Sequence, residues 1–357
     1  MAEHFHPLRV AEVVPETSEA NSIRFDIPPE LRDRFAFRAG QHLTLRATIG
    51  GEEVRRNYSL CTAPDEQDWM VTVKRIAGGI FSNWVGDHLK PSDVIDVMPP
   101  HGSFTTEFDP ARERRYVGFA GGSGITPIIS LIRTALKQEP ASRFTLLYGN
   151  RDSASVIFLD ALAELKDRYL SRFELYHFLA EEAGEVELLN GMLDRATCDR
   201  AIEHLVGDPA QVDEWFICGP GPMMDAAEAS LLDRSIAKDR IHIERFTADR
   251  PPEAVAREMA DLQTKAAGAS VMVTLDGRTR KVEFAEGNIL DSARAAGLAA
   301  PFACKAGVCA TCRAKVTAGK VEMAARYGLT DEEVAAGYVL TCQSVPVGEG
   351  VAVDYDA

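Results

Sequence analysis

Four cysteines near the end of the chain have a spacing that suits a metal centre. Cys304, Cys309 and Cys312 follow the pattern Cys-x4-Cys-x2-Cys, and Cys342 lies further along the chain. This is the ligand spacing of plant-type [2Fe–2S] clusters. The residues between the ligands are mostly small, so backbone N–H groups could approach the sulfur atoms and tune a potential. A tetrahedral zinc site is the alternative, although zinc sites usually contain two short Cys-x-x-Cys pairs and only one occurs here.

A glycine-rich segment is the second candidate site. Residues 121–127 read Gly-Gly-Ser-Gly-Ile-Thr-Pro and stand between a predicted buried strand, residues 115–120, and a predicted helix. Backbone N–H groups at such a helix start favour a pyrophosphate, and Pro127 suits the first helical turn. The alternative for the segment taken alone is a structural turn. A second strand–turn–helix pattern, Cys-Gly-Pro-Gly-Pro-Met at 218–223, favours a nucleotide crevice on one parallel sheet.

The third candidate lies in the first hundred residues. Arg56-Asn57-Tyr58-Ser59 could hold a phosphate, stack on a flat ring and bond a ring nitrogen. Residues 78–82, Gly-Gly-Ile-Phe-Ser, precede a predicted helix that runs toward Leu89 and could bind a further phosphate. The alternative for this segment is a surface arginine and a packed tyrosine on a barrel.

Three patterns in the sequence predict the elements that position these residues. Short β-type runs up to about residue 100 predict a barrel or sandwich. Strands that alternate with helices after residue 112 predict a doubly wound parallel sheet. A hairpin with Asp276-Gly277 at its turn starts a third unit. The predicted domains are 1–111, 112–248 and 269–357, with a linker at 249–268 that is in part helical.

Composition excludes several classes of protein. The 357 residues carry a formal net charge of −15, which argues against a general nucleic-acid binder and against docking on an anionic membrane. The start of the chain lacks the basic and apolar regions of a signal peptide. No uninterrupted apolar run is long enough to span a membrane. A cytoplasmic protein is expected.

Cys61 and Cys198 match no motif and are expected to be structural.

Taken in order, the motifs resemble the ferredoxin–NADP reductase superfamily with a C-terminal plant-type ferredoxin, over nearly the whole chain. Within it the chain is most similar to the reductase subunits of phenylacetyl-CoA epoxidases. The reductases of Rieske-type oxygenases, such as 3-ketosteroid 9α-hydroxylase, are nearly as similar. The resemblance is carried by the stretches at residues 148–151, 216–220, 242–246, 304–312 and 335–343.

The resemblance implies an antiparallel FAD-binding β-barrel, an NAD(P)-binding α/β domain and a β-grasp [2Fe–2S] domain. Arg56 would hold the FAD pyrophosphate, Tyr58 would cover the isoalloxazine and Ser59 would lie beside flavin N5. Phe246 would stack on the other flavin face, and Cys218 would lie near the nicotinamide ring. The cluster ligands would be Cys304, Cys309, Cys312 and Cys342. Further FAD residues would be Val73, Lys74, Gly79, Ile80, Phe81 and Ser82. The nicotinamide nucleotide would be held by Gly122, Gly124, Ile125, Thr126, Pro127, Asn150, Arg151, Cys218, Gly219 and Pro220.

The residues around position 151 bear on the identity of the nucleotide. Arg151 could pair with the 2′-phosphate of NADPH, whereas its neighbour Asp152 would repel that group. Some NADPH-using relatives carry a Ser-Arg pair where residues 179–182 read Leu-Ala-Glu-Glu. The resemblance favours NADPH, with NADH as the alternative.

The cofactor set predicts an oxidoreductase that passes electrons from NAD(P)H through FAD and [2Fe–2S] to an oxygenase. Flavin accepts a hydride and releases single electrons, which connects the two ends of the chain. The partner is expected to be the diiron phenylacetyl-CoA epoxidase or, as the alternative, a Rieske-type oxygenase. Lys305 and Arg313 are candidate contacts, and the protein alone is expected to be a monomer. A redox-sensing iron–sulfur protein is the hypothesis of another class.

Overall fold

The structure, a computed structural model, describes residues 5–246, 252–266, 268–284 and 287–357. These residues form two compact units. The two-sheet unit contains His6–Val54 and Tyr58–Glu244, and the C-terminal unit contains the described part of Arg245–Ala357 with Phe5 and Arg55–Asn57. Within the described ranges, no helix combines the length and the apolar character that crossing a membrane requires. The predicted domain boundaries stay predictions.

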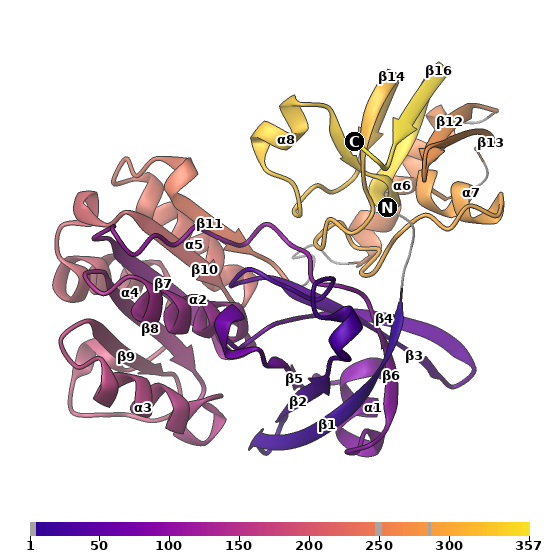
Figure 1. The fold of residues 1–357 in the computed structure, drawn as a ribbon. Coiled ribbons are helices and arrows are strands. Elements are labelled where there is room, and N and C mark those ends of the chain that lie inside the picture. Colours follow the sequence, from indigo (N-terminus) through magenta and orange to yellow (C-terminus); the bar gives the residue numbers. More distant parts are fainter. Residues whose placement is uncertain (1–4, 247–251, 267, 285–286) are drawn as a thin grey trace. The chain divides into compact units, whose positions relative to one another are not determined.

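The two-sheet unit begins with a six-stranded antiparallel sheet in the order β4-β3-β6-β1-β2-β5 (Figure 1). A bridge between Leu60, just after β4, and Val71 on β5 brings its two edges together, so the sheet closes into a barrel. Helix α1 closes the barrel core by burying Phe81 and Val85. The elements are β1 (His6–Thr17), β2 (Ala20–Asp26), β3 (His42–Ile49), β4 (Glu52–Ser59), β5 (Trp69–Lys74), α1 (Ile80–His88) and β6 (Val94–Val97).

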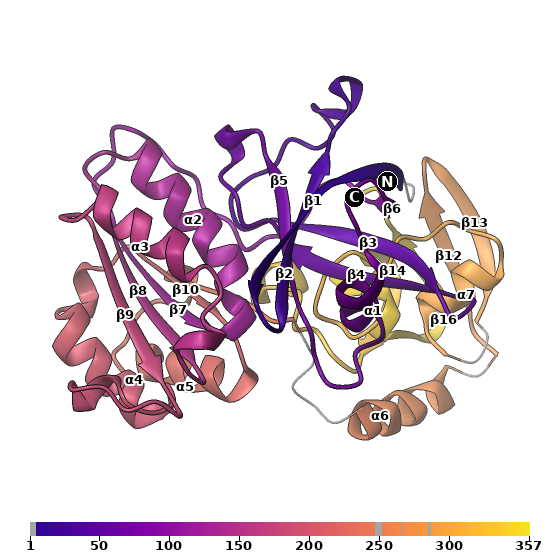
Figure 2. The same ribbon diagram turned by 90° about the horizontal axis from the view of Figure 1, so that it is seen from below.

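A parallel five-stranded sheet follows in the order β11-β10-β7-β8-β9. Helices α2 and α3 cover one face and α4 and α5 the other, as Figure 1 and Figure 2 show. This confirms the predicted doubly wound architecture. The strands are β7 (Arg115–Gly121), β8 (Arg143–Asn150), β9 (Phe173–Leu179), β10 (Glu214–Cys218) and β11 (Ile241–Glu244). The helices are α2 (Ile125–Gln138), α3 (Leu159–Arg168), α4 (Arg195–Ala201) and α5 (Gly221–Leu232).

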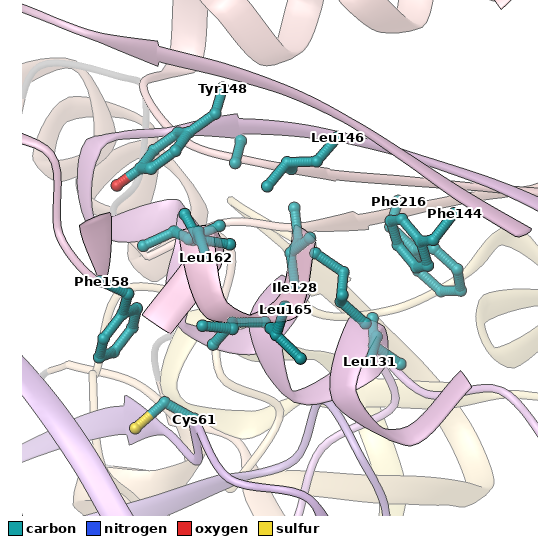
Figure 3. Packing of buried hydrophobic residues seen from close by; sticks show 14 of the residues in the cluster. Cys61, Ile128, Leu131, Phe144, Leu146, Tyr148, Phe158, Leu162, Leu165 and Phe216 are labelled. Atoms are coloured by element: carbon teal, nitrogen blue, oxygen red, sulfur yellow. The ribbon is translucent and has the colours of Figure 1, made fainter. Parts of the chain in front are cut away.

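One apolar cluster joins the barrel to the parallel sheet. It is built from α2, α3 and the inner strands, and Figure 3 shows Ile128, Leu162, Tyr148 and Phe216 within it. Cys61 from the barrel belongs to the same cluster, and its thiol donates to the Met70 carbonyl at 3.3 Å. Burial of this shared apolar surface holds the two sheets in one unit.

The C-terminal unit is built on a mixed sheet in the order β13-β12-β16-β14-β15, in which β12 and β16 pair in parallel and the other described neighbours are antiparallel. Helix α7 packs Ile289, Leu290 and Ala293 on the sheet, which gives the expected β-grasp arrangement. The elements are β12 (Ser270–Leu275), β13 (Arg278–Glu283), α7 (Ile289–Ala295), β14 (Arg313–Met323), α8 (Asp331–Ala335), β15 (Tyr338–Leu340) and β16 (Ser344–Asp354).

The predicted linker contains a helix, α6 (Pro252–Lys265). Its Leu262, with Ala266 just beyond, packs on Ala324 and Val345 of the C-terminal unit. Residues 249–251 and 267 of this segment lie outside the described residues. The described part of the segment therefore packs as part of the C-terminal unit.

Candidate functional site

The two glycine turns meet at the carboxyl edge of the parallel sheet. Strands β7 and β10 are neighbours, and Ala120 pairs with Cys218 in their register. A Cβ at Gly124 would lie 2.0 Å from the Cys218 carbonyl oxygen, and one at Gly219 would lie 2.9 Å from the Gly121 nitrogen. Only glycine permits this approach. The two segments therefore form one surface lined by main chain, as a pyrophosphate site requires.

Several residues predicted to bind the nucleotide turn their side chains into the core instead. Ile125, Thr126 and Pro127 are buried at the start of α2, and the Thr126 hydroxyl donates to the Ser123 carbonyl at 3.0 Å. They can contribute only through the backbone. Tyr148, which is fully buried, donates to the Gly122 carbonyl at 2.9 Å and fixes the turn.

Lys74, which the resemblance assigns to the FAD site, lies beside the nucleotide turn. Its Nζ is 3.7 Å from the position that a Cβ at Gly122 would occupy. Lys74 ends β5 of the barrel, and Gly122 begins the turn after β7. A cation here can approach an anionic group bound at the turn.

The predicted flavin residues lie on three elements of the barrel domain, β4, β5 and α1. The rings of Tyr58 and Phe81 have centroids 5.8 Å apart, and Val73 is buried beside them in the same core cluster. Phe81 is 1% exposed, so it can support a flavin only through its backbone N–H or by packing under Tyr58. Gly79 precedes α1, and a Cβ there would lie 2.4 Å from Ser82 Oγ. No side chain caps the start of α1, so its first N–H groups can face a phosphate.

Three residues from separate elements meet where barrel and parallel sheet join. Ser59 Oγ at the end of β4 donates to Glu244 Oε2 at 3.1 Å. Glu244 ends β11 and pairs in register with Cys218 at the end of β10. Burial raises the pKa of Glu244 to about 8 and the pKa of the Cys218 thiol well above its usual range. At neutral pH the junction is therefore uncharged, with a carboxylic acid that can donate a proton.

Two buried histidines of the barrel lie next to this junction. His42 Nδ1 lies 3.6 Å from Glu244 Oε1, and the rings of His42 and His101 meet edge to face with centroids 4.2 Å apart. Burial lowers the pKa of His42 to about 4 and that of His101 to about 3. Both imidazoles are neutral at pH 7. Neither Glu244 nor the histidines were predicted from the sequence, although Glu244 stands at a strand end two residues before Phe246.

The structure gives the positions of the remaining predicted cofactor-binding residues, and their binding roles stay predictions. Arg56 is exposed on β4 and donates to the Arg55 carbonyl at 2.7 Å. Phe246 follows β11 and is 39% exposed. Asn150 ends β8, Arg151 follows it, and Pro220 caps the start of α5. Ile80, in the first turn of α1, is 55% exposed.

The four cysteines of the C-terminal unit meet as two pairs. Cys304 is hydrogen-bonded to Cys309, and Cys312 to Cys342. No three His, Cys, Asp or Glu side chains of the described residues converge on one metal position. Two thiols for each of two irons is the arrangement that a [2Fe–2S] cluster needs. The hydrogen bond between Cys304 and Cys309 lowers the pKa of the Cys304 thiol and, together with burial, raises the pKa of Cys309.

The loop that carries three of these thiols has the backbone of a cluster cradle. The Ala306 N–H donates to Cys304 Sγ at 3.3 Å, and Gln343 Nε2 donates to Cys342 Sγ at 3.7 Å. Lys305 and Ala310 both have positive φ, at 52° and 53°. Such conformations are costly for residues with side chains and cluster at functional sites. The residues present therefore fit a [2Fe–2S] group.

The two cations proposed to contact a partner are paired within their own unit. Lys305 Nζ lies 2.7 Å from Asp291 Oδ1, and Arg313 pairs with Glu333. Both side chains are more than 40% exposed, so each pair lies at the surface. A partner that uses either cation must compete with the internal carboxylate.

Comparison with known proteins accords with each part of this geometry. Residues 7–106 match an oxidoreductase FAD-binding domain, residues 119–229 an oxidoreductase NAD-binding domain, and residues 273–347 a 2Fe-2S iron-sulfur cluster binding domain. The chain is 42% identical to one of the subunits of the 1,2-phenylacetyl-CoA epoxidase of Escherichia coli K12, over 99% of this chain and 98% of that protein. It is 36% identical to the ferredoxin reductase component of 3-ketosteroid-9-alpha-monooxygenase from Rhodococcus rhodochrous, over 98% and 96%. Phthalate dioxygenase reductase has the same fold, with a TM-score of 0.61, 24% identity and 98% of each chain covered.

Proposed function

The chain belongs to the family of oxygenase reductase components that combine FAD-binding, NAD-binding and 2Fe-2S domains, and on that premise we propose that the oxygenase it serves epoxidises phenylacetyl-CoA. The chain is an NAD(P)H-dependent oxidoreductase that passes electrons through FAD and [2Fe–2S]. The proposal concerns the protein that receives those electrons.

One observation carries this choice of partner. The identity to the phenylacetyl-CoA epoxidase component is 42% over essentially both whole chains, against 36% for the steroid monooxygenase component from Rhodococcus. The match includes the C-terminal unit, which holds the thiols that would bind the [2Fe–2S] cluster, the group that passes electrons to a partner. A Rieske-type oxygenase remains the second candidate, because the steroid component shares the same full length.

Within this function the chain's own residues have positioning roles. The turns at Gly122–Gly124 and Gly219 would hold the nucleotide by backbone N–H groups, and Tyr58 and Val73 would form the wall of the flavin site. Bound flavin supplies the conversion of a hydride into single electrons. Ser59 would orient the reacting ring by a hydroxyl that Glu244 holds at 3.1 Å, and the buried Cys218 would exclude water from the same place. The neutral Glu244 carboxyl holds a proton at this junction.

The test is reconstitution with purified oxygenases. Holoenzyme, NADH or NADPH and phenylacetyl-CoA are combined with a phenylacetyl-CoA epoxidase oxygenase component, and a Rieske oxygenase with its own substrate is run in parallel. Epoxide formation with little Rieske turnover supports the proposal. Turnover only with the Rieske component would contradict the proposal and would identify the partner as an oxygenase that hydroxylates rings or steroids.

The proposal includes a transient partnership. The reductase acts as a monomer that meets the oxygenase through the C-terminal unit, because a carrier that turns over must separate from its acceptor. Size-exclusion chromatography with light scattering on the holoenzyme, alone and with the oxygenase component, measures this. A stable complex of the two at micromolar concentration would contradict it.

A further inference from the structure

The nucleotide site has an acidic edge beside its glycine turn. Strands β7 and β8 are parallel neighbours, and Gly121 pairs with Gly149 in their register. Residues that follow β8 therefore lie next to the turn at Gly122–Gly124. In doubly wound sheets, the end of the strand beside the phosphate-binding turn is where the adenosine ribose lies, and the charge there selects between a 2′-hydroxyl and a 2′-phosphate.

The cation at this position is already paired with a carboxylate that further hydrogen bonds hold in place. Arg151 Nε donates to Asp152 Oδ2 at 3.2 Å. The other oxygen of Asp152 accepts from the Ser155 N–H at 2.9 Å, and the Asp152 N–H donates to Ser155 Oγ at 3.1 Å. This reciprocal capping fixes the Asp152 carboxylate beside Arg151. The guanidinium would have to leave its partner to meet a phosphate.

The neighbouring strand adds two more carboxylates. The Glu181 N–H donates to the Arg151 carbonyl at 2.7 Å, which places the segment after β9 along this edge. Glu182 Oε2 accepts from the Ser153 N–H at 2.8 Å. Hydrogen bonds from Arg151 lower the pKa of Asp152, and the Ser153 N–H lowers the pKa of Glu182. Both are therefore anionic at neutral pH, and Glu19 and Glu181 also act on Arg151.

We propose that this edge, made of Asp152, Glu181 and Glu182 around Arg151, makes the enzyme select NADH over NADPH. The inference rests on the proposed reductase function and replaces the sequence-based preference for NADPH. A carboxylate can accept hydrogen bonds from both ribose hydroxyls of NADH. The 2′-phosphate of NADPH carries a charge of roughly −1.5 to −2 at pH 7. Three carboxylates with one guanidinium repel that charge over a distance of about a Debye length.

The experiment measures binding and turnover separately. Isothermal titration of oxidised holoenzyme with 5′-AMP and with 2′,5′-ADP compares the two ribose forms without any redox step. The ratio of kcat/KM for NADH and NADPH is measured with ferricyanide as acceptor. We expect at least about a tenfold preference for 5′-AMP and for NADH, which corresponds to about 1.4 kcal/mol.

Variants assign the preference to the acidic edge. Glu182→Gln should reduce the preference severalfold, and Glu182→Arg should bring it to unity or reverse it. Glu164→Gln, which removes the same charge from an exposed position on α3, is the matched control and should leave the preference unchanged. Equal or tighter binding of 2′,5′-ADP by the wild type overturns the inference, as does an unchanged ratio in both Glu182 variants. If neither nucleotide reduces the flavin, the proposed function fails, while the binding ratio still tests the acidic edge.

Discussion

Ser59 and Glu244 are 185 residues apart in the chain, yet the Ser59 hydroxyl donates to the Glu244 carboxyl at 3.1 Å. The contact joins the last residue of a barrel strand to the last residue of the parallel sheet. A flavin held by the barrel and a nicotinamide held by the sheet would meet at such a junction. The carboxyl is neutral at pH 7 because burial raises its pKa.

Replacement of Glu244 should change how stability depends on pH. The pKa of Glu244 rises from its usual 4.5 to about 8 on folding, so the native state binds the proton more tightly than the unfolded state. The stability that this proton contributes is fully present below about pH 4.5 and is lost as pH rises to about 8. Glu244→Gln should therefore lose less stability than wild type between pH 5 and 8. Urea unfolding at several pH values measures the difference, and parallel pH curves for the two proteins would contradict it.

The two buried histidines should act in the opposite direction. Their folded-state pKa values, about 4 for His42 and about 3 for His101, lie below the usual 6.5. The unfolded chain takes up protons below pH 6.5 that the native state refuses, so stability falls from pH 6.5 toward 4. NMR of the ring protons should show no titration step above about pH 5 for His42 and His101. His42→Gln and His101→Gln assign the signals. A midpoint near 6.5 for either would show that it is not buried as described.

Loss of one cluster ligand should stop reduction of the cluster without stopping reduction of the flavin. Cys342→Ala removes one of the two thiols on one side of the cluster, because Cys312 and Cys342 form a pair. Cluster reduction should be abolished, while NAD(P)H still bleaches the flavin absorbance. Stopped-flow spectra of both chromophores measure this. Cys198→Ala, at a buried cysteine of the two-sheet unit, is the control and should keep the cluster spectrum. Failure of flavin reduction in Cys342→Ala would contradict the prediction that the flavin is reduced without the cluster.

A methyl group at Gly124 should disrupt the nucleotide turn. The new Cβ would lie 2.0 Å from the Cys218 carbonyl oxygen, so the two turns must move apart. We expect Gly124→Ala to lose stability by about 1–3 kcal/mol and to weaken nucleotide binding by at least tenfold. Gly184→Ala is the control, since its Cβ would meet only Asn190 Oδ1, at 3.7 Å. Thermal unfolding and titration with NAD⁺ and NADP⁺ measure both effects. Equal behaviour of the two variants would show that the close approach is not needed.

The sequence by itself determined the features that depend on neighbours along the chain. The spacing of Cys304, Cys309 and Cys312 and the glycine turn at 121–127 are local patterns whose chemistry follows from residue type and interval. The alternation of strands and helices after residue 112 also indicated the parallel sheet, because apolar periodicity reports which face is buried. The strand predicted at residues 115–120 is β7 (Arg115–Gly121), and the helix predicted after the glycine turn is α2 (Ile125–Gln138).

Tertiary structure alone decided which distant residues share a site. Nothing in the local pattern around Glu244 indicates Ser59 or His42 as its neighbour, because the register of separate sheets sets that contact. The same holds for Lys74 beside Gly122 and for Glu182 bound to the Ser153 N–H. A raised or lowered pKa depends on burial and on partners brought by the fold. For this reason the sequence indicated the cofactors. The protonation of Glu244 beside Ser59 and Cys218, and the acidic edge of the nucleotide site, depend on the folded structure.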